Sequence, residues 1–398
     1  MKFGLFYNPQ VPKPLDQDDW EPEQERERFH AVLDQIELAD KVGFDYVVLG
    51  EHHFTAEYAH NSSPEVLLGA ISQRTKRIRL VTGIMHMSHN DPIRTAERIA
   101  TLDLVSDGRI EFGAGTGTGS EIVPFVGGDP EVQRGRAASA TQIAVDILGE
   151  RGIYPGHHDE YFDIPPINVI PKSYQRPHPP LWMSTTNAEG TKRAAREGVG
   201  ILQLTAAGPE ELAQRVEEYW ATLKAEAKPI GKAANPSFFA FASALMAPTR
   251  EEAIARGRES IEFFAYGLMG GQQLTQSDPK AHLRRAFVDW KEGRGDARER
   301  LGVPPQALEM SARFADLPSN LLGTPDDARV LLEAFERTNV DAILFREFEG
   351  WMRHEHVMES IELLGTQVLP EFRARHAAHE AWRAEQLKDF PYPTNSSV

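Results

Sequence analysis

Short apolar runs alternate along the chain with longer segments whose apolar residues recur at helical spacing. The runs are rich in β-branched and aromatic residues, which is typical of buried strands in a parallel sheet. They cover residues 2–7, 44–49, 78–84, 109–113, 181–185, 199–204, 238–245 and 342–346. Eight strands that alternate with helices predict an α/β fold, namely a (β/α)8 TIM barrel.

Helix signals fall between these runs. Phe29, Leu33 and Ile36 recur at helical spacing within residues 23–42, and Gly43 stands where that helix is expected to end. A barrel with insertions reaches the chain length of 398 residues, so we expect one domain over residues 1–398. Amphipathic helices over residues 355–385 are expected to complete it.

Two stretches interrupt the alternation. Residues 115–128 begin with Gly-Thr-Gly-Thr-Gly, and we predict a glycine-rich loop there. Residues 270–322 are too long for an ordinary strand-to-helix connection, so they are interpreted as an inserted subdomain or lid after the seventh strand.

Composition narrows the classes of function. A formal net charge of −16 argues against a nucleic acid or an anionic membrane as the partner. The chain has no cysteine, which excludes disulfides, thiolate metal sites and thiol nucleophiles. No apolar stretch approaches the roughly 18 residues of a membrane span, and the N-terminal run is too short for a signal peptide. A cytoplasmic location is therefore expected.

Polar side chains gather directly after the predicted strands. On a barrel, the carboxyl ends of the strands meet at one mouth, so these side chains are expected to converge there. They are Glu51, His52 and His53 after the second strand, His86 and His89 after the third, Thr116 to Ser120 after the fourth, Ser184 to Asn187 after the fifth, and Arg346 and Glu347 after the eighth.

Two of these groups each allow two interpretations. Hydroxyl groups at the start of the helix after residue 187 suit either a phosphate or plain N-capping. Histidines at positions 52, 53, 86 and 89 beside a carboxylate are also compatible with a metal site. Against a metal, no His-x-His lies on the first strand and no aspartate ends the eighth, so we predict none.

Two motifs carry a resemblance to a known family. One is residues 43–54, Gly-Phe-Asp-Tyr-Val-Val-Leu-Gly-Glu-His-His-Phe. The other, in residues 92–109, sets nine positions at fixed spacing: Pro92, Arg94, Ala96, Glu97, Leu102, Asp103, Ser106, Gly108 and Arg109. Together they resemble the bacterial luciferase-like, flavin-dependent monooxygenases. Weaker similarity runs on to residues 323–325 and leaves 270–322 unaccounted for.

This resemblance implies a TIM barrel that binds reduced FMN (FMNH2) at its C-terminal mouth. Such two-component enzymes receive FMNH2 from a separate NAD(P)H:flavin reductase. Oxygen adds to the flavin to give a C4a-hydroperoxide, which oxygenates a small organic substrate. The resemblance also implies a homodimer.

The resemblance assigns roles by position. His52 matches the family's catalytic histidine, a general acid or base, with His53 and Glu51 supporting it. Gly83 and Ile84 fall where relatives have a non-prolyl cis peptide under the flavin ring. The flavin phosphate loop is matched by Thr185, Thr186, Asn187, Gly190 and Thr191.

Two departures leave alternatives open. Luciferases have a phosphate-binding arginine where this chain has Thr116. Either the Gly-Thr loop or another cation such as Arg193 takes over that contact, or the phosphate is held less tightly. The luciferase aldehyde pocket cannot be traced, so light emission is not expected. Residues 120–128 and 265–322 are expected to shape the substrate pocket, with Phe125, Phe263, Phe264 and Tyr266. An F420-dependent oxidoreductase and a non-catalytic flavin-binding protein remain as alternatives.

Overall fold

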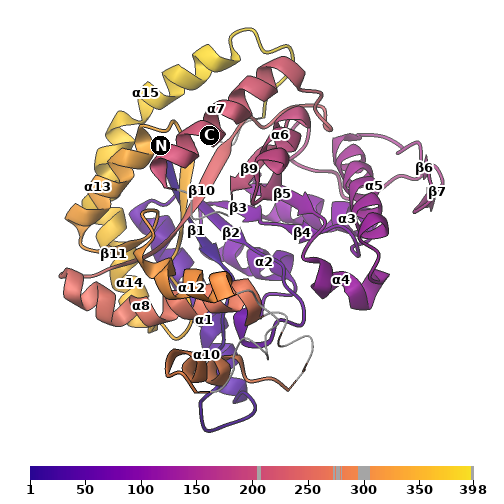
Figure 1. Cartoon of the computed structure of the whole chain (residues 1–398). Helices are drawn as coiled ribbons and strands as arrows, with labels where there is room; N and C mark the ends of the chain where they lie inside the picture. Colours follow the sequence, from indigo (N-terminus) through magenta and orange to yellow (C-terminus); the bar gives the residue numbers. More distant parts are fainter. Residues whose placement is uncertain (204–207, 272–273, 275–277, 279, 295–304, 396–398) are drawn as a thin grey trace.

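A closed barrel of eight parallel strands forms the centre of the computed structural model, which describes residues 1–203, 208–271, 274, 278, 280–294 and 305–395 (Figure 1). Strand β12 pairs with β1 and closes the ring. All eight predicted strands are confirmed. They are β1 (Lys2–Tyr7), β2 (Tyr46–Leu49), β3 (Arg79–Thr82), β5 (Ile110–Gly115), β8 (Leu181–Thr185), β9 (Gly200–Gln203), β10 (Phe238–Met246) and β12 (Ala342–Arg346).

Helices surround this barrel (Figure 1). They are α1 (Pro22–Val42), α2 (Pro64–Arg74), α3 (Pro92–Val105), α5 (Pro130–Gly149), α6 (Ala188–Arg196), α7 (Pro209–Glu226), α8 (Arg250–Tyr266), α13 (Pro325–Glu336), α14 (His354–Leu363) and α15 (Leu369–Leu387). One-turn π segments extend α8 over Gly267–Gly271 and join α14 to α15 over Leu364–Val368. Smaller elements are β4 (Met85–His86), the hairpin of β6 (His157–His158) with β7 (Asp163–Ile164), and the 3-10 turns Ala56–Tyr58 and Phe314–Asp316.

Local sequence explains where α1 begins and ends. The side chain of Gln24 accepts a hydrogen bond from the backbone N–H of Glu21 at 2.9 Å, and Pro22 supplies the first turn. At the other end Gly43 has a φ of 106°, a left-handed conformation that glycine adopts without a steric cost. The chain can therefore turn directly from α1 into β2.

Alternate residues of the strands face opposite sides of the barrel wall, as the period of two requires. Outward residues such as Val47 and Leu49 pack in the large core beneath the helices. The inward residues form a separate buried layer that fills the barrel: Phe6, Tyr46, Val48, Val81, Trp182, Leu202, Phe239, Phe241, Ala342 and Leu344.

The predicted glycine-rich loop is wrong in part, because residues within it form a helix, α4 (Gly119–Val126). Gly127, with a φ of 81°, follows its last turn. Glycine and proline are poor helix formers, so local propensity does not predict this element. Packing stabilises it instead, since Glu121 and Ile122 are both fully buried.

The described part of residues 270–322 holds α10 (Leu283–Lys291), α12 (Pro305–Arg313) and a short strand, β11 (Leu321–Gly323). Strand β11 pairs with the end of β10, and both helices contact α8. In Figure 1, α10 lies below the barrel. The interpretation of this segment as a lid stays a prediction.

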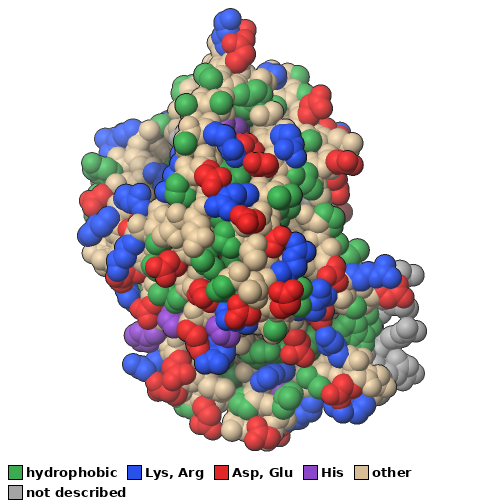
Figure 2. All heavy atoms as spheres, turned by 90° about the vertical axis from the view of Figure 1, so that its left-hand side faces the viewer, with side chains coloured by type: hydrophobic (Ala, Val, Ile, Leu, Met, Phe, Trp, Pro, Cys, Tyr) green, Lys and Arg blue, Asp and Glu red, His purple; other side chains and the backbone are tan. Residues whose placement is uncertain are grey.

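Acidic and basic side chains are intermingled on the face that carries α13 and α15 (Figure 2). Arg329 pairs with Glu371 at 2.7 Å and Arg375 with Glu336 at 3.1 Å, which joins these two helices. None of the described helices combines the length and hydropathy of a membrane-spanning segment.

Candidate active site

A cavity of about 760 Å³ opens at the carboxyl ends of the barrel strands. This volume lies within the range of roughly 300–1,000 Å³ that is usual for small-molecule sites. Side chains from six different strand ends reach it: Asn8, His52, Ile84, Thr116, Thr186 and Arg346. The polar groups predicted to converge at one mouth therefore do so for these positions.

His52 is held in the cavity wall by a contact at each ring nitrogen. Its Nδ1 lies 3.0 Å from Oε1 of Glu121, and its Nε2 lies 3.0 Å from Nδ2 of Asn8. A carboxylate can only accept, so Nδ1 carries a proton and Nε2 is left as the basic nitrogen. The ring also meets Tyr58 edge to face, with centroids 5.5 Å apart. These contacts fix the orientation of a group that can accept or donate a proton.

Glu121 is the residue that orients His52, and it was not among the site residues predicted from the sequence. Burial would raise the pKa of its carboxyl, but the His52 ring and the backbone N–H of His53 hold that pKa below its usual value. Glu121 is therefore ionised at neutral pH. A single acid followed by Ile122 and Val123 was the available signal, because an acid in so apolar a stretch needs a buried partner.

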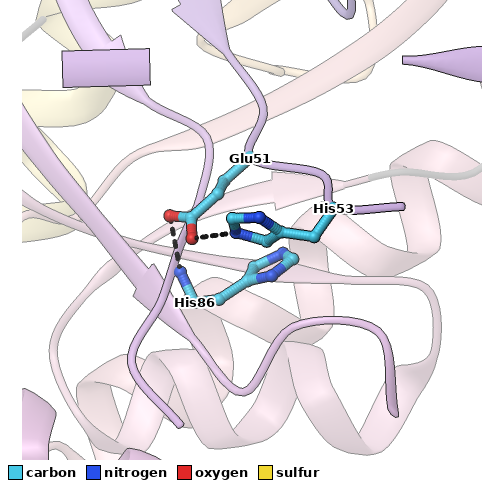
Figure 3. A group of neighbouring side chains, drawn as sticks. All are labelled: Glu51, His53 and His86. Carbon is cyan, nitrogen blue, oxygen red and sulfur yellow. Dashed lines mark hydrogen bonds and ion pairs between the residues drawn. The ribbon is translucent and has the colours of Figure 1, made fainter. Parts of the chain in front are cut away.

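Glu51 accepts hydrogen bonds from several neighbouring groups at once. Its Oε1 lies 2.9 Å from Nε2 of His53, 3.2 Å from Nε2 of His89 and 3.1 Å from Nδ2 of Asn90. Its Oε2 accepts the backbone N–H of His86 at 3.1 Å (Figure 3). Burial raises the pKa of Glu51, but the bonds from His53 and His89 bring it far below the usual value. Glu51 is thus a permanent carboxylate that organises three histidines.

The same residues bear on the metal question. Ligand atoms of Glu51, His53 and His86 all lie within 4.8 Å of one another (Figure 3). Burial lowers the pKa of His86 to about 4, which keeps that ring neutral, the form that suits a metal ligand and a hydrogen-bond network equally. Both oxygens of Glu51, however, already accept hydrogen bonds. We interpret the cluster as a hydrogen-bonded support for the loop that carries His52.

The predicted cofactor residues divide into two sets. Gly83, Ile84, Thr116 and Thr186 line the cavity, and the peptide bond between Gly83 and Ile84 is cis, as expected. The other set lies outside the cavity lining and runs from the end of β8 into the first turn of α6: Thr185, Asn187, Gly190 and Thr191. There Oδ1 of Asn187 accepts the N–H of Gly190 at 2.9 Å, so this residue is the N-cap of α6.

Several features of the cavity fit a phosphorylated ring cofactor. The Oγ of Ser184 is buried without a hydrogen-bond partner among the described residues, and Ser184 lines the cavity beside Thr186. Two cations, Arg134 and Arg193, line the same cavity. A Cβ added to Gly115 would lie 2.2 Å from Cδ1 of Ile84, so a larger residue there would displace the Ile84 side chain.

The four aromatic residues expected at the substrate pocket have different surroundings. Phe264 lines the cavity, whereas Phe263 and Tyr266 are buried against Phe287. Phe125 is 46% exposed and stacks on His89 with centroids 4.2 Å apart. Arg134, Tyr58 and Asn8 also line the cavity, and the sequence analysis had not named them as site residues.

Residues 1–342 match the family model for luciferase-like monooxygenases. The chain belongs to this family. Limonene 1,2-monooxygenase of Rhodococcus erythropolis is 28% identical to this luciferase-like monooxygenase over 86% of the chain and 81% of that protein. The oxygenase component of a flavin-dependent trigonelline monooxygenase of Acinetobacter baylyi is 23% identical over 94% and 96%. An uncharacterised Sinorhizobium fredii protein is 32% identical, but the match covers only 53% of it and 47% of this chain.

Solved structures agree with the fold. Monooxygenase RslO1 of Streptomyces bottropensis superimposes with a TM-score of 0.69 at 22% identity, over 94% of this chain and all of that one. The oxygenating constituent of 3,6-diketocamphane monooxygenase of Pseudomonas putida, in complex with FMN, has a TM-score of 0.67 at 17% identity, over 93% and 98%. An F420-dependent secondary alcohol dehydrogenase has a TM-score of 0.65 at 17% identity, over 92% and 98%.

Proposed function

We propose that this luciferase-like monooxygenase is the oxygenase component of a two-component system. It takes FMNH2 from a separate NAD(P)H:flavin reductase and uses O2 to oxygenate a small organic substrate. The observation that carries the proposal is His52, which is held by Glu121 and Asn8 in the same cavity that Ser184, with its unpartnered hydroxyl, lines. A relative of nearly equal length is itself named as the oxygenase component of a flavin-dependent enzyme.

Reduced flavin, when bound, supplies with O2 the oxygen atom that is transferred. The chain supplies binding, orientation and proton management. Hydroxyls of Ser184 and Thr186, the N-terminus of α6 and the cations Arg134 and Arg193 would hold the phosphate. Gly83 and Ile84 would support the ring system.

Proton transfer falls to His52. Its Nε2 would accept a proton from the reacting atoms in place of the hydrogen bond from Nδ2 of Asn8 and then return it, while the Nδ1–H bond to Glu121 keeps the ring in one tautomer. Tyr58 packs edge to face on His52, and Phe264 stacks on Tyr58 at 5.7 Å. This aromatic wall would exclude water from the site.

The test supplies photoreduced FMN and ¹⁸O2 to the purified chain, with limonene and trigonelline as probe substrates, and measures labelled product by mass spectrometry. The wild type is expected to incorporate label, and His52→Ala to lose about 10²–10⁴-fold of that rate. His30→Ala, on the outer helix α1, is a matched control. Equal label incorporation by His52→Ala and the wild type at every pH would remove His52 from its proposed role.

A second candidate is an F420-dependent oxidoreductase, because F420-dependent enzymes are among the similar solved structures. Equilibrium dialysis of the chain against FMN and against F420 separates the two. Tight F420 binding, with hydride transfer to it from an alcohol and no use of O2, would replace the main proposal. Flavin binding without either reaction would leave a non-catalytic flavin-binding protein.

A further inference from the structure

Arg346 is the last residue of β12, and its guanidinium lies in the wall of the cavity that holds His52. The residue is only 6% exposed. Its Nε and Nη2 lie 3.3 and 3.2 Å from Oγ of Ser243, and Nε is 3.2 Å from Oε1 of Glu349. These contacts occupy one edge of the planar group. Among the described residues its Nη1 has no hydrogen-bond partner, so the edge formed by Nη1 and Nη2 is open.

The obvious alternative is a purely structural ion pair between Arg346 and Glu349. Burial, however, raises the pKa of Glu349 to about 8, although Arg346 and Ser243 act in the opposite direction. Burial also lowers the pKa of Arg346, so the ion pair only partly offsets the cost of burying the two groups. A buried cation without a full counter-charge is costly, and a structural role alone does not explain why it is retained.

The surroundings of Arg346 are aromatic and aliphatic. The guanidinium carbon lies 4.6 Å from the ring centroid of Phe264. Tyr58, Leu268 and Met269 line the same cavity. An open guanidinium edge beside apolar side chains matches a molecule that combines a carboxylate with an apolar body. Arginine binds carboxylates through two parallel N–H bonds, which also fixes the orientation of the ligand.

We infer that Arg346 binds a carboxylate of the substrate through its Nη1 and Nη2 edge, so that this enzyme oxygenates an organic acid. The inference rests on the proposed oxygenase function and adds the substrate class. The carboxylate end would lie at the end of β12, with the apolar body directed along Tyr58 and Phe264 toward His52. Arg346 thereby determines specificity.

Isothermal titration calorimetry on the full chain tests this inference, with benzoate as the probe and benzamide as its neutral match. Saturating FMN is present, so that the cations proposed for the flavin phosphate are occupied. We expect benzoate to bind the wild type at least tenfold more tightly than benzamide does. Arg346→Gln is expected to lower the affinity for benzoate at least tenfold and to change the affinity for benzamide less than twofold.

Two further variants guard against misfolding and general charge effects. Arg346→Lys keeps the charge but loses the paired N–H groups, so its benzoate affinity should fall between those of the wild type and Arg346→Gln. Arg353→Gln removes an arginine whose side chain is 70% exposed and should bind like the wild type. The FMN dissociation constant should agree within twofold in all four proteins.

Three results would overturn the inference: equal benzoate binding by the wild type and Arg346→Gln, equal binding of benzoate and benzamide by the wild type, or a tenfold loss of FMN affinity in Arg346→Gln. The third would assign Arg346 to the cofactor. Because calorimetry requires no turnover, these results are independent of the oxygenation assay. Arg346-dependent benzoate binding by a chain that oxygenates nothing would support the carboxylate site and count against the proposed function only.

Discussion

Two pairs of buried carboxylates lie at the C-terminal side of this barrel, and their protonation states are opposite. Glu51 and Glu121 belong to the histidine side, between β2 and α4, whereas Glu347 and Glu349 follow β12. The residues are 4%, 0%, 1% and 4% exposed, so burial does not distinguish them. Yet the pKa of the first two lies below the usual range, and burial raises the pKa of the last two to about 8.

Hydrogen-bond donors account for the difference. Glu51 and Glu121 each accept bonds from a histidine ring and from a backbone N–H. Among the described residues neither oxygen of Glu347 makes a hydrogen bond of normal geometry, although Ser360 lies close enough to lower its pKa, and one oxygen of Glu349 has no partner. Burial disfavours the ionised form of every carboxyl group, and hydrogen-bond donors directed at the carboxylate favour that form again. The barrel mouth thus combines an ionised side suited to proton transfer with a side around Arg346 where burial raises the pKa of both carboxyls.

The largest expected effect is on the ionised side. Glu121→Gln should reduce the oxygenation rate about 100-fold, because an amide in place of the carboxylate no longer fixes the proton on Nδ1 of His52. The rate is measured with the ¹⁸O2 assay.

Glu131→Gln, an exposed position on α5, serves as the control and should leave the rate unchanged. An oxygenation rate in Glu121→Gln equal to that of the wild type would show that Glu121 does not orient His52 for the reaction.

The sequence predicted the features that depend on one local segment and missed those that depend on distant residues. The eight strands were predicted because each is a continuous apolar run, a signal that lies within the strand itself. His52 and Glu51 were found because they follow such a run directly. Glu121 was missed because its partners lie 69 and 68 residues away in the chain, and helix α4 is stabilised by that burial rather than by local propensity.

Arg346 illustrates the same limit. Its place after a strand was visible, but the open edge of its guanidinium depends on the positions of Ser243 and Glu349, which come from two different segments. The predicted phosphate loop is a further example, because only some of its residues line the cavity. Thr186 lines the cavity while Thr191 is fully buried behind it, and sequence spacing alone did not separate them.

A smaller effect is expected from Glu51→Gln. The variant should lose about 2 kcal/mol of unfolding free energy at pH 7, because His53 and His89 lose a charged acceptor. A carboxyl whose folded pKa is depressed contributes stability above its unfolded pKa and loses it as the pH falls through the folded value. The difference in unfolding free energy between the wild type and the variant, measured by urea unfolding, should therefore become smaller below pH 4.5.

Dialysis against EDTA supplies the control for that experiment. If Glu51 is a hydrogen-bonded centre, the melting temperature of the wild type stays unchanged after chelation. A fall in melting temperature that Zn²⁺ reverses would instead assign Glu51, His53 and His86 to a metal.

The smallest effect, and the one of opposite sign, is expected at Glu347. Its folded pKa of about 8 exceeds the ordinary 4.5, so the folded chain holds a proton there that the unfolded chain releases between these values. Stability from this group therefore falls as the pH rises from 4.5 to 8. Glu347→Gln cannot ionise, so its free energy of unfolding relative to the wild type should rise by about 1–2 kcal/mol between pH 6 and pH 8.5. Urea unfolding at both pH values measures this. A variant that is destabilised equally at pH 6 and 8.5 would mean that Glu347 is already ionised in the folded protein and that the contrast between the two sides is wrong.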